Sequence, residues 1–546
     1  LSPNIYLYCL PRSVLLNFKL MKLDPKPGIP RRDLIKGVTA ASLGLAAGSI
    51  GIPNSIGNTK VSSASRQNLI PIENAKPGTR DWQLTNTRQL HGKINKILDD
   101  GRCPWIEGYC SANSVRAGET LRVMVSTNPV SDFKLEIFRT GYYNGDGARL
   151  MKRFDGLKGK AQPDPEVGEN HVRECNWEPS VEFEIPSDWL SGVYLGKLTA
   201  EKENIQSYVI FIARDDRPCD LLFQCSDNTW SAYNRWPADF SIYTSHEGKS
   251  TTGFPSGSVS FDRPYGLFTH PVNKHKTSGG SGEFLPWEFP LSFWLEQHGY
   301  DVSYISNVDT HVDPRGLLRT KSFISVGHDE YWSVEMYDNV LKACNEGVNL
   351  AFLSANAVFC VVPMLPSNKG VPNRTIRREG WFNPLPPGAK LPPNMIHQDG
   401  FKPVFDRDAA QLMGARTPLA AFNGSGDWTC AKPEHWLFEG TGMKAGDSIK
   451  GLVGWEMHAE PAMDLPGMEI VAKGPTMAGN KKGDYTATVY NGPKGNIVFN
   501  AATIWWANGL SSPPGHQTPV RHGVAQQGVD ERVQKISHNL FQRMIR

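Results

Sequence analysis

The sequence predicts a chain built in two parts, an all-β domain of the sandwich kind followed by an α/β domain on a parallel sheet. Between about residues 105 and 215, short segments alternate apolar and polar residues with a period of two, most regularly in residues 134–139 and 181–185. From about residue 218, apolar strands and helical segments follow one another, the order that produces a parallel, doubly wound sheet. Roughly 490 residues beyond the N-terminal region are too many for a single hydrophobic core, so two domains are expected.

The first part is expected to be an immunoglobulin-like β-sandwich. Turn signals at residues 116–119 and 144–147 separate its short strands, and this spacing is typical of two packed antiparallel sheets. The Tyr-rich stretch at residues 141–147 is interpreted as a tight hairpin with packed tyrosines. A sandwich that precedes an enzyme domain usually supports or orients it, so a supporting role is expected for this part.

Helical and strand patterns alternate in the second part. In the helix predicted over residues 332–345, Met336, Val340 and Cys344 fall four apart on one face, and Gly347 follows in a position that ends helices. The further elements expected here are a helix over residues 290–298 and strands over residues 220–225, 301–305, 321–326, 348–353, 451–457, 485–491 and 496–503. Residues 365–450 are rich in Pro and Gly and are expected to cross the surface of the sheet.

Chemistry is expected where the parallel strands end, because open α/β sheets bind ligands beyond the carboxyl ends of their strands. One predicted strand is followed directly by His328, Glu330 and Tyr331, more polar groups than a helix cap requires. His328 could act as a general acid or base, and Glu330 could act with it. Glu330 and Tyr331 could also give oxygen ligands to a hard or borderline metal ion. Asp227 follows another strand and is a candidate catalytic carboxylate.

A second candidate group lies later in the chain, at Glu456, His458 and Glu460. Alternate residues of a strand share one side, so the two carboxylates could flank the imidazole and bind a metal. A solvated strand edge explains the same pattern equally well, and both interpretations stay open.

The nine cysteines favour no thiol chemistry. No Cys-x-x-Cys pair occurs, which argues against a zinc ribbon or a thioredoxin-type site. Cys103 and Cys110 could close a small loop in an oxidising compartment. Cys225 ends a strand but has no obvious histidine partner, and no Gly-x-Ser-x-Gly elbow is present at the strand ends, so a nucleophilic Cys or Ser is disfavoured.

The N-terminal region predicts export. Arg31 and Arg32 precede a mild apolar run over residues 37–50, the layout of a twin-arginine signal. The run is shorter than the roughly 20 residues that span a bilayer, so no integral membrane span is expected. A net charge of +3 on 546 residues gives no reason to expect a nucleic-acid partner. The predicted divisions are residues 1–60 for the signal and a preceding extension, 61–104 for a linker, 105–216 for the sandwich and 217–546 for the α/β domain.

Several motifs together resemble one family. They are Ser226–Asn234, Phe261–Tyr265, Trp294–Val302, Gly327–Ser333 and Gly347–Phe352. The chain resembles the C-terminal domain of the N,N-dimethylformamidase large (beta) subunit over about residues 218–515, and its GHDEYWS segment is the most specific part. Arg139–Tyr143 also resembles the segment that often precedes this domain in secreted relatives.

The resemblance implies a fold and a metal. The fold would be flavodoxin-like, of the class I glutamine-amidotransferase-like shape without the thiol nucleophile. The metal would be a single iron held by two tyrosines and one glutamate, in an enzyme that hydrolyses a small tertiary amide. Tyr331 lies in the matched motif and is the first expected ligand, with Tyr304 and Tyr233 as candidates for the second. The candidates for the glutamate are Glu456 and Glu460.

We therefore expect an exported, periplasmic or extracellular amidohydrolase that cleaves a carboxamide C–N bond with metal-activated water. Its expected partner is a small amide or a ligand of the cell envelope, and association into a homo-oligomer is left open. One alternative is a non-catalytic envelope protein that binds a glycan or peptide in an aromatic cleft. The other is a hydrolase without metal that uses His328 and a carboxylate.

Overall fold

A computed structural model gives the arrangement of these segments. It describes residues 67–546 except 89, 91–101, 239, 245–256, 267–277, 383–405, 419–422, 517–519, 522–523 and 526–527. The predicted export signal therefore lies outside the described residues, as does part of the predicted linker. Strands outnumber helices in an α/β structure that is rich in sheet.

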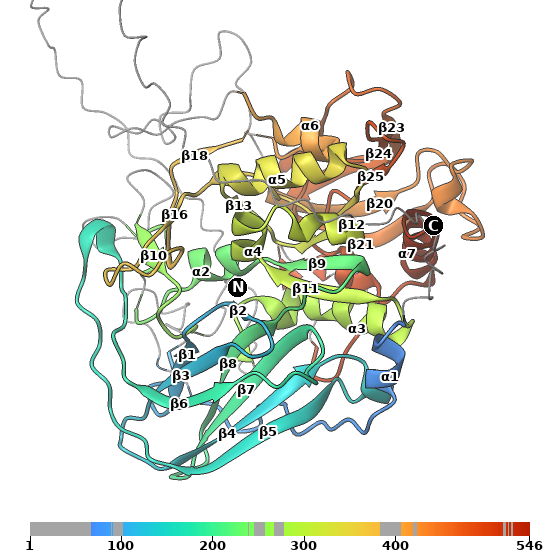
Figure 1. Ribbon diagram of the computed structural model, residues 1–546. Helices are drawn as coiled ribbons and strands as arrows, with labels where there is room; N and C mark the ends of the chain where they lie inside the picture. Colours follow the sequence, from blue (N-terminus) through green and yellow to red (C-terminus); the bar gives the residue numbers. More distant parts are fainter. Residues whose placement is uncertain are drawn as a thin grey trace, which may run out of the picture. The chain divides into compact units, whose positions relative to one another are not determined.

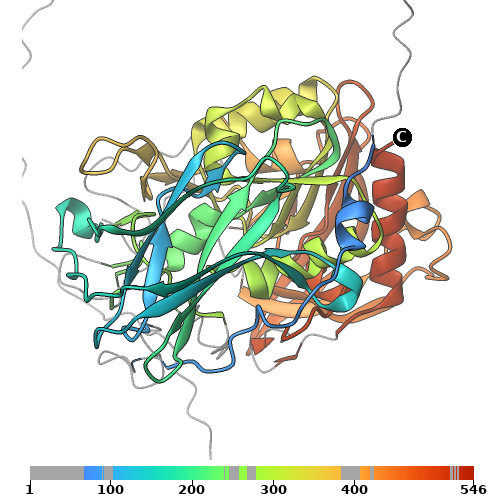
Figure 2. The same ribbon diagram turned by 60° about the horizontal axis from the view of Figure 1, so that its bottom comes forward.

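The first part of the described chain forms two sheets around one core. The sheets have the strand orders β1-β3-β6 and β2-β8-β7-β4-β5. Their strands are β1 Glu107–Cys110, β2 Ser114–Val115, β3 Thr120–Ser126, β4 Phe133–Thr140, β5 Ala148–Leu157, β6 Pro179–Glu184, β7 Gly192–Ala200 and β8 Gln206–Ala213. Alternate apolar residues of both sheets, such as Val123, Leu135 and Val209, share one buried cluster. Figure 2 brings these strands forward.

The second part is built on a nine-stranded sheet with the order β11-β9-β12-β14-β25-β24-β23-β20-β21. The first five strands are parallel, and the remaining four are antiparallel. The sheet is thus mixed, whereas the sequence pattern predicted a parallel one. The strands are β9 Cys219–Cys225, β11 Val302–Ser306, β12 Thr320–Gly327, β14 Asn349–Ser354, β20 Asn423–Thr429, β21 Ser448–Glu456, β23 Glu469–Ala478, β24 Lys481–Asn491 and β25 Ile497–Asn500.

Helices cover both faces of the parallel strands (Figure 1). In β9, Leu221 and Phe223 pack with α3 and α7, while Leu222 points to the opposite side and packs with α5. Alternation of this kind buries a strand on both faces, which is why these strands read as continuous apolar runs. The described helices are α1 Ile70–Asn74, α2 Asp227–Tyr233, α3 Phe289–Gln297, α4 Asn307–Val312, α5 Val334–Asn345, α6 Ala409–Met413, α7 Glu531–Met544 and the π-helix η4 Phe284–Glu288.

Short strands complete the described sheet structure. They are β10 Ser258–Ser260, β13 Tyr331–Trp332, β15 Cys360–Val361, β16 Met364–Leu365, β17 Thr375–Arg377, β18 Gly380–Trp381, β19 Ala415–Arg416, β22 Glu460–Pro461, β26 Val520–Arg521 and β27 Val524–Ala525. Within the described ranges no helix has the length and apolar character that crossing a membrane requires. Cys103 and Cys110 are buried free thiols in the sandwich core, so the predicted small loop is not closed by a disulfide.

A buried ion pair joins the two parts of the structure. Arg139 at the end of β4 donates to both carboxylate oxygens of Glu296 in α3, at 2.8 and 3.0 Å, and both side chains are fully buried. Asn74 of α1 and Tyr304 of β11 donate to the same carboxylate. The segment Arg139–Tyr143, which resembles a segment of secreted relatives, therefore has a structural role here. It anchors the sandwich to the α/β part.

The packing of α7 makes stability depend on pH. Partly buried His538 contacts the ring of His298. Burial lowers the pKa of His538 to about 4, and His298 acts in the same direction. Since an unfolded histidine has a pKa of about 6.5, the unfolded state binds the proton first, and stability is complete above that pH and lost as the pH falls towards 4. We expect this one group to lower the free energy of unfolding by about 1 kcal/mol between pH 7 and pH 5.

Urea denaturation at both pH values measures this loss, and the His538→Gln variant is the control. The variant should lose about 1 kcal/mol less than the parent protein on acidification. An equal loss in both proteins would show that His538 does not contribute.

Candidate functional site

The candidate site lies where β9 and β12 end side by side. These strands are parallel neighbours, so the segments that follow them meet at one edge of the sheet. Helix α2 follows β9 and carries Tyr233 as its last residue. Residues 328–330 follow β12, and Tyr331 then opens the short strand β13, which pairs with β15. Neighbouring parallel strands thus bring Tyr233 and residues 328–331 together.

A glycine makes the sharp turn after β12. Gly327 has a φ of +65°, and a Cβ atom placed on it would lie 2.8 Å from the Cβ of Trp287. Only glycine adopts this backbone conformation readily and also leaves space for Trp287. The turn directs His328 and Glu330 back towards α2.

We expect Gly327→Ala to lower the free energy of unfolding by about 2 kcal/mol or more, because strain and crowding add. Gly370→Ala is the matched control, since Gly370 also has a positive φ (+77°) but faces open space. Gly370→Ala should lower the free energy of unfolding by only about 1 kcal/mol. Urea denaturation compares the two variants, and equal losses would rule out crowding at Trp287.

The polar side chains at this edge form one connected chain. The Tyr331 and Tyr243 hydroxyls are 2.5 Å apart, and those of Tyr243 and Tyr233 are 3.1 Å apart. Tyr233 in turn donates to Glu330 Oε2 at 2.7 Å. His328 Nε2 lies 3.1 Å from that same oxygen.

Glu456 completes the chain, because its Oε2 lies 2.7 Å from His328 Nε2. Glu456 is the last residue of β21, a strand at the far end of the sheet order. The chain returns towards the parallel strands directly after it, where Met457 forms a bridge with Thr503, just beyond β25. Residues after β12 and at the end of β21 therefore contribute to one site, although the two strands lie far apart in the sheet order.

Electrostatics favour a positively charged His328. Burial lowers the pKa of the imidazole, but the carboxylates of Glu456 and Glu330 outweigh burial and raise the pKa well above its ordinary value. The phenols behave in the opposite way. Burial, followed by the charge of Glu330, raises the pKa of Tyr233 and of Tyr331 well above the ordinary value. The site therefore pairs an imidazolium with carboxylates beside neutral phenols.

Of the residues predicted from sequence, four converge: His328, Glu330, Tyr331 and Glu456. Tyr233, a candidate for the second tyrosine, joins them. Tyr304, the other candidate, does not, because its buried hydroxyl donates to Glu296 at 3.0 Å in the network that anchors the sandwich. Glu460 lies on the surface in an ion pair with Arg416 at 2.9 Å.

The Asp227 carboxylate also forms its hydrogen bonds with residues outside this chain of polar side chains. It accepts from the Asn307 amide at 2.6 Å and from the Asn113 side chain at 2.5 Å, and so ties α2 to α4 and to the sandwich. Burial raises the pKa of Asp227 to about 7. His458 is fully buried, with Nδ1 2.9 Å from Asn500 Oδ1, and burial lowers its pKa to about 4. Neither residue has a described contact with His328.

Two residues of the site escaped the sequence analysis. Tyr243 lies in an irregular stretch after α2, where no periodic pattern indicates a fixed position. Glu283 directly precedes the π-helix η4, and a π-helix leaves no clear sequence signal. Burial raises the pKa of Glu283 to about 8, while the charge of His328 opposes that rise. The glycines at positions 279, 280 and 282 were the only sign of an unusual backbone there.

The donor atoms present fit a hard cation better than zinc. In the described part of the chain, no group of three or more His, Cys, Asp and Glu side chains is arranged to hold a metal ion. Oxygens of Tyr233, Tyr243 and Glu330 do converge, with successive spacings of 3.1 and 2.7 Å. Adjacent ligands of an octahedral ion with bonds of about 2.0–2.1 Å lie about 2.9 Å apart, so these spacings are compatible with one shared ion.

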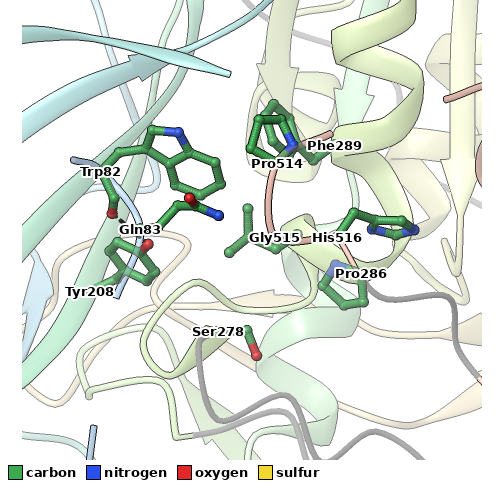
Figure 3. A pocket seen from close by; sticks show the side chains of 10 residues that line it. Trp82, Gln83, Tyr208, Ser278, Pro286, Phe289, Pro514, Gly515 and His516 are labelled. Carbon is green, nitrogen blue, oxygen red and sulfur yellow. Dashed lines mark hydrogen bonds between the residues drawn. The ribbon is translucent and has the colours of Figure 1, made fainter. Parts of the chain in front are cut away.

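Aromatic side chains also line a separate hollow, shown in Figure 3. Its volume is about 30 Å³, room for roughly two water molecules. Trp82 donates to a backbone carbonyl, Tyr208 donates to the Trp82 carbonyl, and Phe289 packs edge-on against Trp82. These contacts hold Tyr208 and Phe289 against Trp82.

One known protein family matches more than half of the chain. A family model described as "N,N-dimethylformamidase beta subunit-like, C-terminal" matches residues 134–519. No curated protein matches. A superoxide reductase (neelaredoxin) from Ignicoccus hospitalis is 15% identical over 20% of this chain and 82% of its own, with a TM-score of 0.13. A family 123 glycoside hydrolase from Clostridium perfringens is 9% identical over 45% of this chain and 68% of its own, with a TM-score of 0.09.

Proposed function

The chain belongs to the N,N-dimethylformamidase beta subunit-like, C-terminal family, and from that premise we propose that it hydrolyses the C–N bond of a small carboxamide. The observation that supports the proposal most is the convergence of Tyr233, Tyr243 and Glu330 beside a histidine clamped by carboxylates. Family membership alone would not identify the chemistry, because one fold serves many reactions.

Iron is the proposed cofactor, with Tyr233, Tyr243 and Glu330 as its ligands. Phenol and carboxylate oxygens favour a hard, highly charged ion such as ferric iron. A bound ferric ion would polarise an amide carbonyl and make water more acidic. This ligand set revises the expectation for Tyr331, because the Tyr331 hydroxyl contacts Tyr243 and has no described hydrogen bond with Glu330. Tyr331 would instead orient the Tyr243 hydroxyl.

The remaining groups would move protons. The charged His328 is suited to give its Nε2 proton to the amide nitrogen as the C–N bond breaks and an amine leaves. Glu456, 2.7 Å from that nitrogen, is suited to take the proton that water loses as it adds to the carbonyl carbon. The products would be a carboxylic acid and an amine. The positive charge on His328 favours an acid role over a base role for this histidine.

Two measurements on the protein purified from its native host test the proposal. Elemental analysis should find about one iron per chain, with visible phenolate-to-iron absorption. Incubation with N,N-dimethylformamide, formamide or acetamide should release dimethylamine or ammonia. A protein without bound metal whose Tyr233→Phe variant keeps full amidase activity would leave the metal-free hydrolase as the better proposal. Iron without amine release from any of the three amides would contradict amide hydrolysis.

Export by the twin-arginine route is also proposed, from the Arg31–Arg32 pair and the apolar run after it. Replacement of both arginines by lysine should retain the protein in the cytosol. We also propose that the two-sheet core is related to immunoglobulin-like sandwiches and the nine-stranded sheet to glutamine amidotransferases. Strand order and the two-faced covering of helices support both relationships.

A further inference from the structure

Glu283 lies on the side of His328 that faces away from the chain of tyrosines. The Nε2 atom of His328 is 2.7 Å from Glu456 and 3.1 Å from Glu330. Its other ring nitrogen, Nδ1, faces Glu283, whose Oε2 is 3.9 Å away. A third carboxyl group thus approaches the same imidazole from the opposite edge. The proposed reaction assigns no role to this group.

The burial of Glu283 is compensated only weakly, by the charge of His328 and by the indole of Trp287. The side chain is about 1% exposed, and neither carboxylate oxygen meets a described donor with full hydrogen-bond geometry. Glu288, five residues later and equally buried, accepts from Trp230 Nε1 at 2.7 Å and from the Ser226 amide at 3.2 Å. A buried carboxyl without such bonds lowers stability, and its presence calls for a functional reason.

The backbone fixes where Glu283 points. Gly280 and Gly282 before it both have positive φ values, and a Cβ atom on Gly282 would lie 2.8 Å from the Trp230 ring. The π-helix η4 begins directly after Glu283. Insertions of this kind are rare and occur often at functional sites, where they change the direction of a side chain. Tightly packed glycines and the wide helical turn together hold Glu283 beside the imidazole.

We propose that Glu283 is a positioning residue that holds the His328 ring through Nδ1, so that Nε2 stays directed at Glu330 and Glu456. The gap of 3.9 Å is short enough for a small side-chain rotation or one bridging water to close it. Hydrogen bonds of catalytic groups are often long before substrate binds. The expected effect on turnover depends on the proposed function, whereas the orientation of the ring does not.

Two variants and a control test this role. Glu283→Leu removes the acceptor and keeps an apolar side chain, and Glu283→Gln keeps an oxygen of the same reach. Glu288→Gln is the matched control, since Glu288 is buried in the same segment but bonds to Trp230 and Ser226. Proton NMR records the downfield ring N–H signals of His328, identified by their loss in His328→Gln. Urea denaturation reports whether each variant is folded.

The Glu283→Leu variant should shift the His328 signals and lower kcat for N,N-dimethylformamide by about 10–100-fold, with KM within about twofold. Glu283→Gln should retain most of the kcat and should shift the His328 signals much less than Glu283→Leu does. Glu288→Gln should leave the His328 signals in place. If Glu283→Leu does not fold, the His328 signals of Glu283→Gln test the proposal instead. They should shift slightly, since an amide replaces the carboxylate beside the ring. Unchanged His328 signals in the folded Glu283 variants would overturn the proposal. A parent protein that releases no amine contradicts the proposed function alone, because the signals still test Glu283.

Discussion

The Glu296→Ala variant is expected to lose about 3–5 kcal/mol in its free energy of unfolding, because it leaves the buried Arg139 guanidinium without its main partner. Glu296 accepts hydrogen bonds from Arg139, Asn74 and Tyr304, and neither member of the ion pair is exposed. A charge buried without compensation costs far more than the lost contact itself. The loss should therefore approach half of the whole stability of an ordinary domain.

Urea denaturation measures the loss, and the chain offers a control pair with the same shortest distance. Arg122 and Glu182 also approach to 2.8 Å, but both are more than half exposed. Glu182→Ala should therefore change stability by no more than about 1 kcal/mol. The double replacement Arg139→Met with Glu296→Leu should recover much of the loss, since an apolar pair removes the unpaired charge. A Glu296→Ala loss as small as the control would contradict the importance of the buried pair.

The sequence predicted local structure well where burial imposes a repeating pattern. Helix α5 was expected because Met336, Val340 and Cys344 recur along one face, and those residues do pack against the sheet. Strand β9 was expected because both of its faces are buried, which produces an uninterrupted apolar run. The antiparallel half of the nine-stranded sheet was not expected, since pairing direction depends on connections that the periodicity does not encode.

Only those residues of the candidate site that lie together in one short segment could be predicted from the sequence. His328, Glu330 and Tyr331 follow a strand directly, so the end of that strand fixed their position in advance. Tyr243 comes from an irregular stretch and Glu456 from the far end of the sheet order, and only the folded chain brings them close. Tyr304 showed the opposite failure. It had the right residue type on a suitable strand, but its phenol serves the Arg139–Glu296 network.

The Tyr233→Phe variant is expected to lose bound iron and to lower kcat by about 10²–10⁴-fold, the largest functional effect we predict. Among the three phenols, the Tyr233 hydroxyl alone contacts both Glu330, at 2.7 Å, and another tyrosine, at 3.1 Å. Its removal would take away the oxygen through which the proposed ligands meet. Tyr331→Phe should keep the iron, because the Tyr331 hydroxyl contacts only Tyr243 among the described hydrogen bonds.

Tyr304→Phe is the matched control for metal binding, since it removes one buried phenol from a different network. That variant should keep both its iron and its phenolate-to-iron absorption, although it should be less stable by about 1 kcal/mol. Elemental analysis and the visible spectrum of the three purified variants separate the alternatives. Loss of iron from Tyr331→Phe together with retention in Tyr233→Phe would reverse the assignment. Loss from Tyr304→Phe would place the metal outside the cluster of Tyr233, Tyr243 and Glu330, because no described contact joins Tyr304 to it.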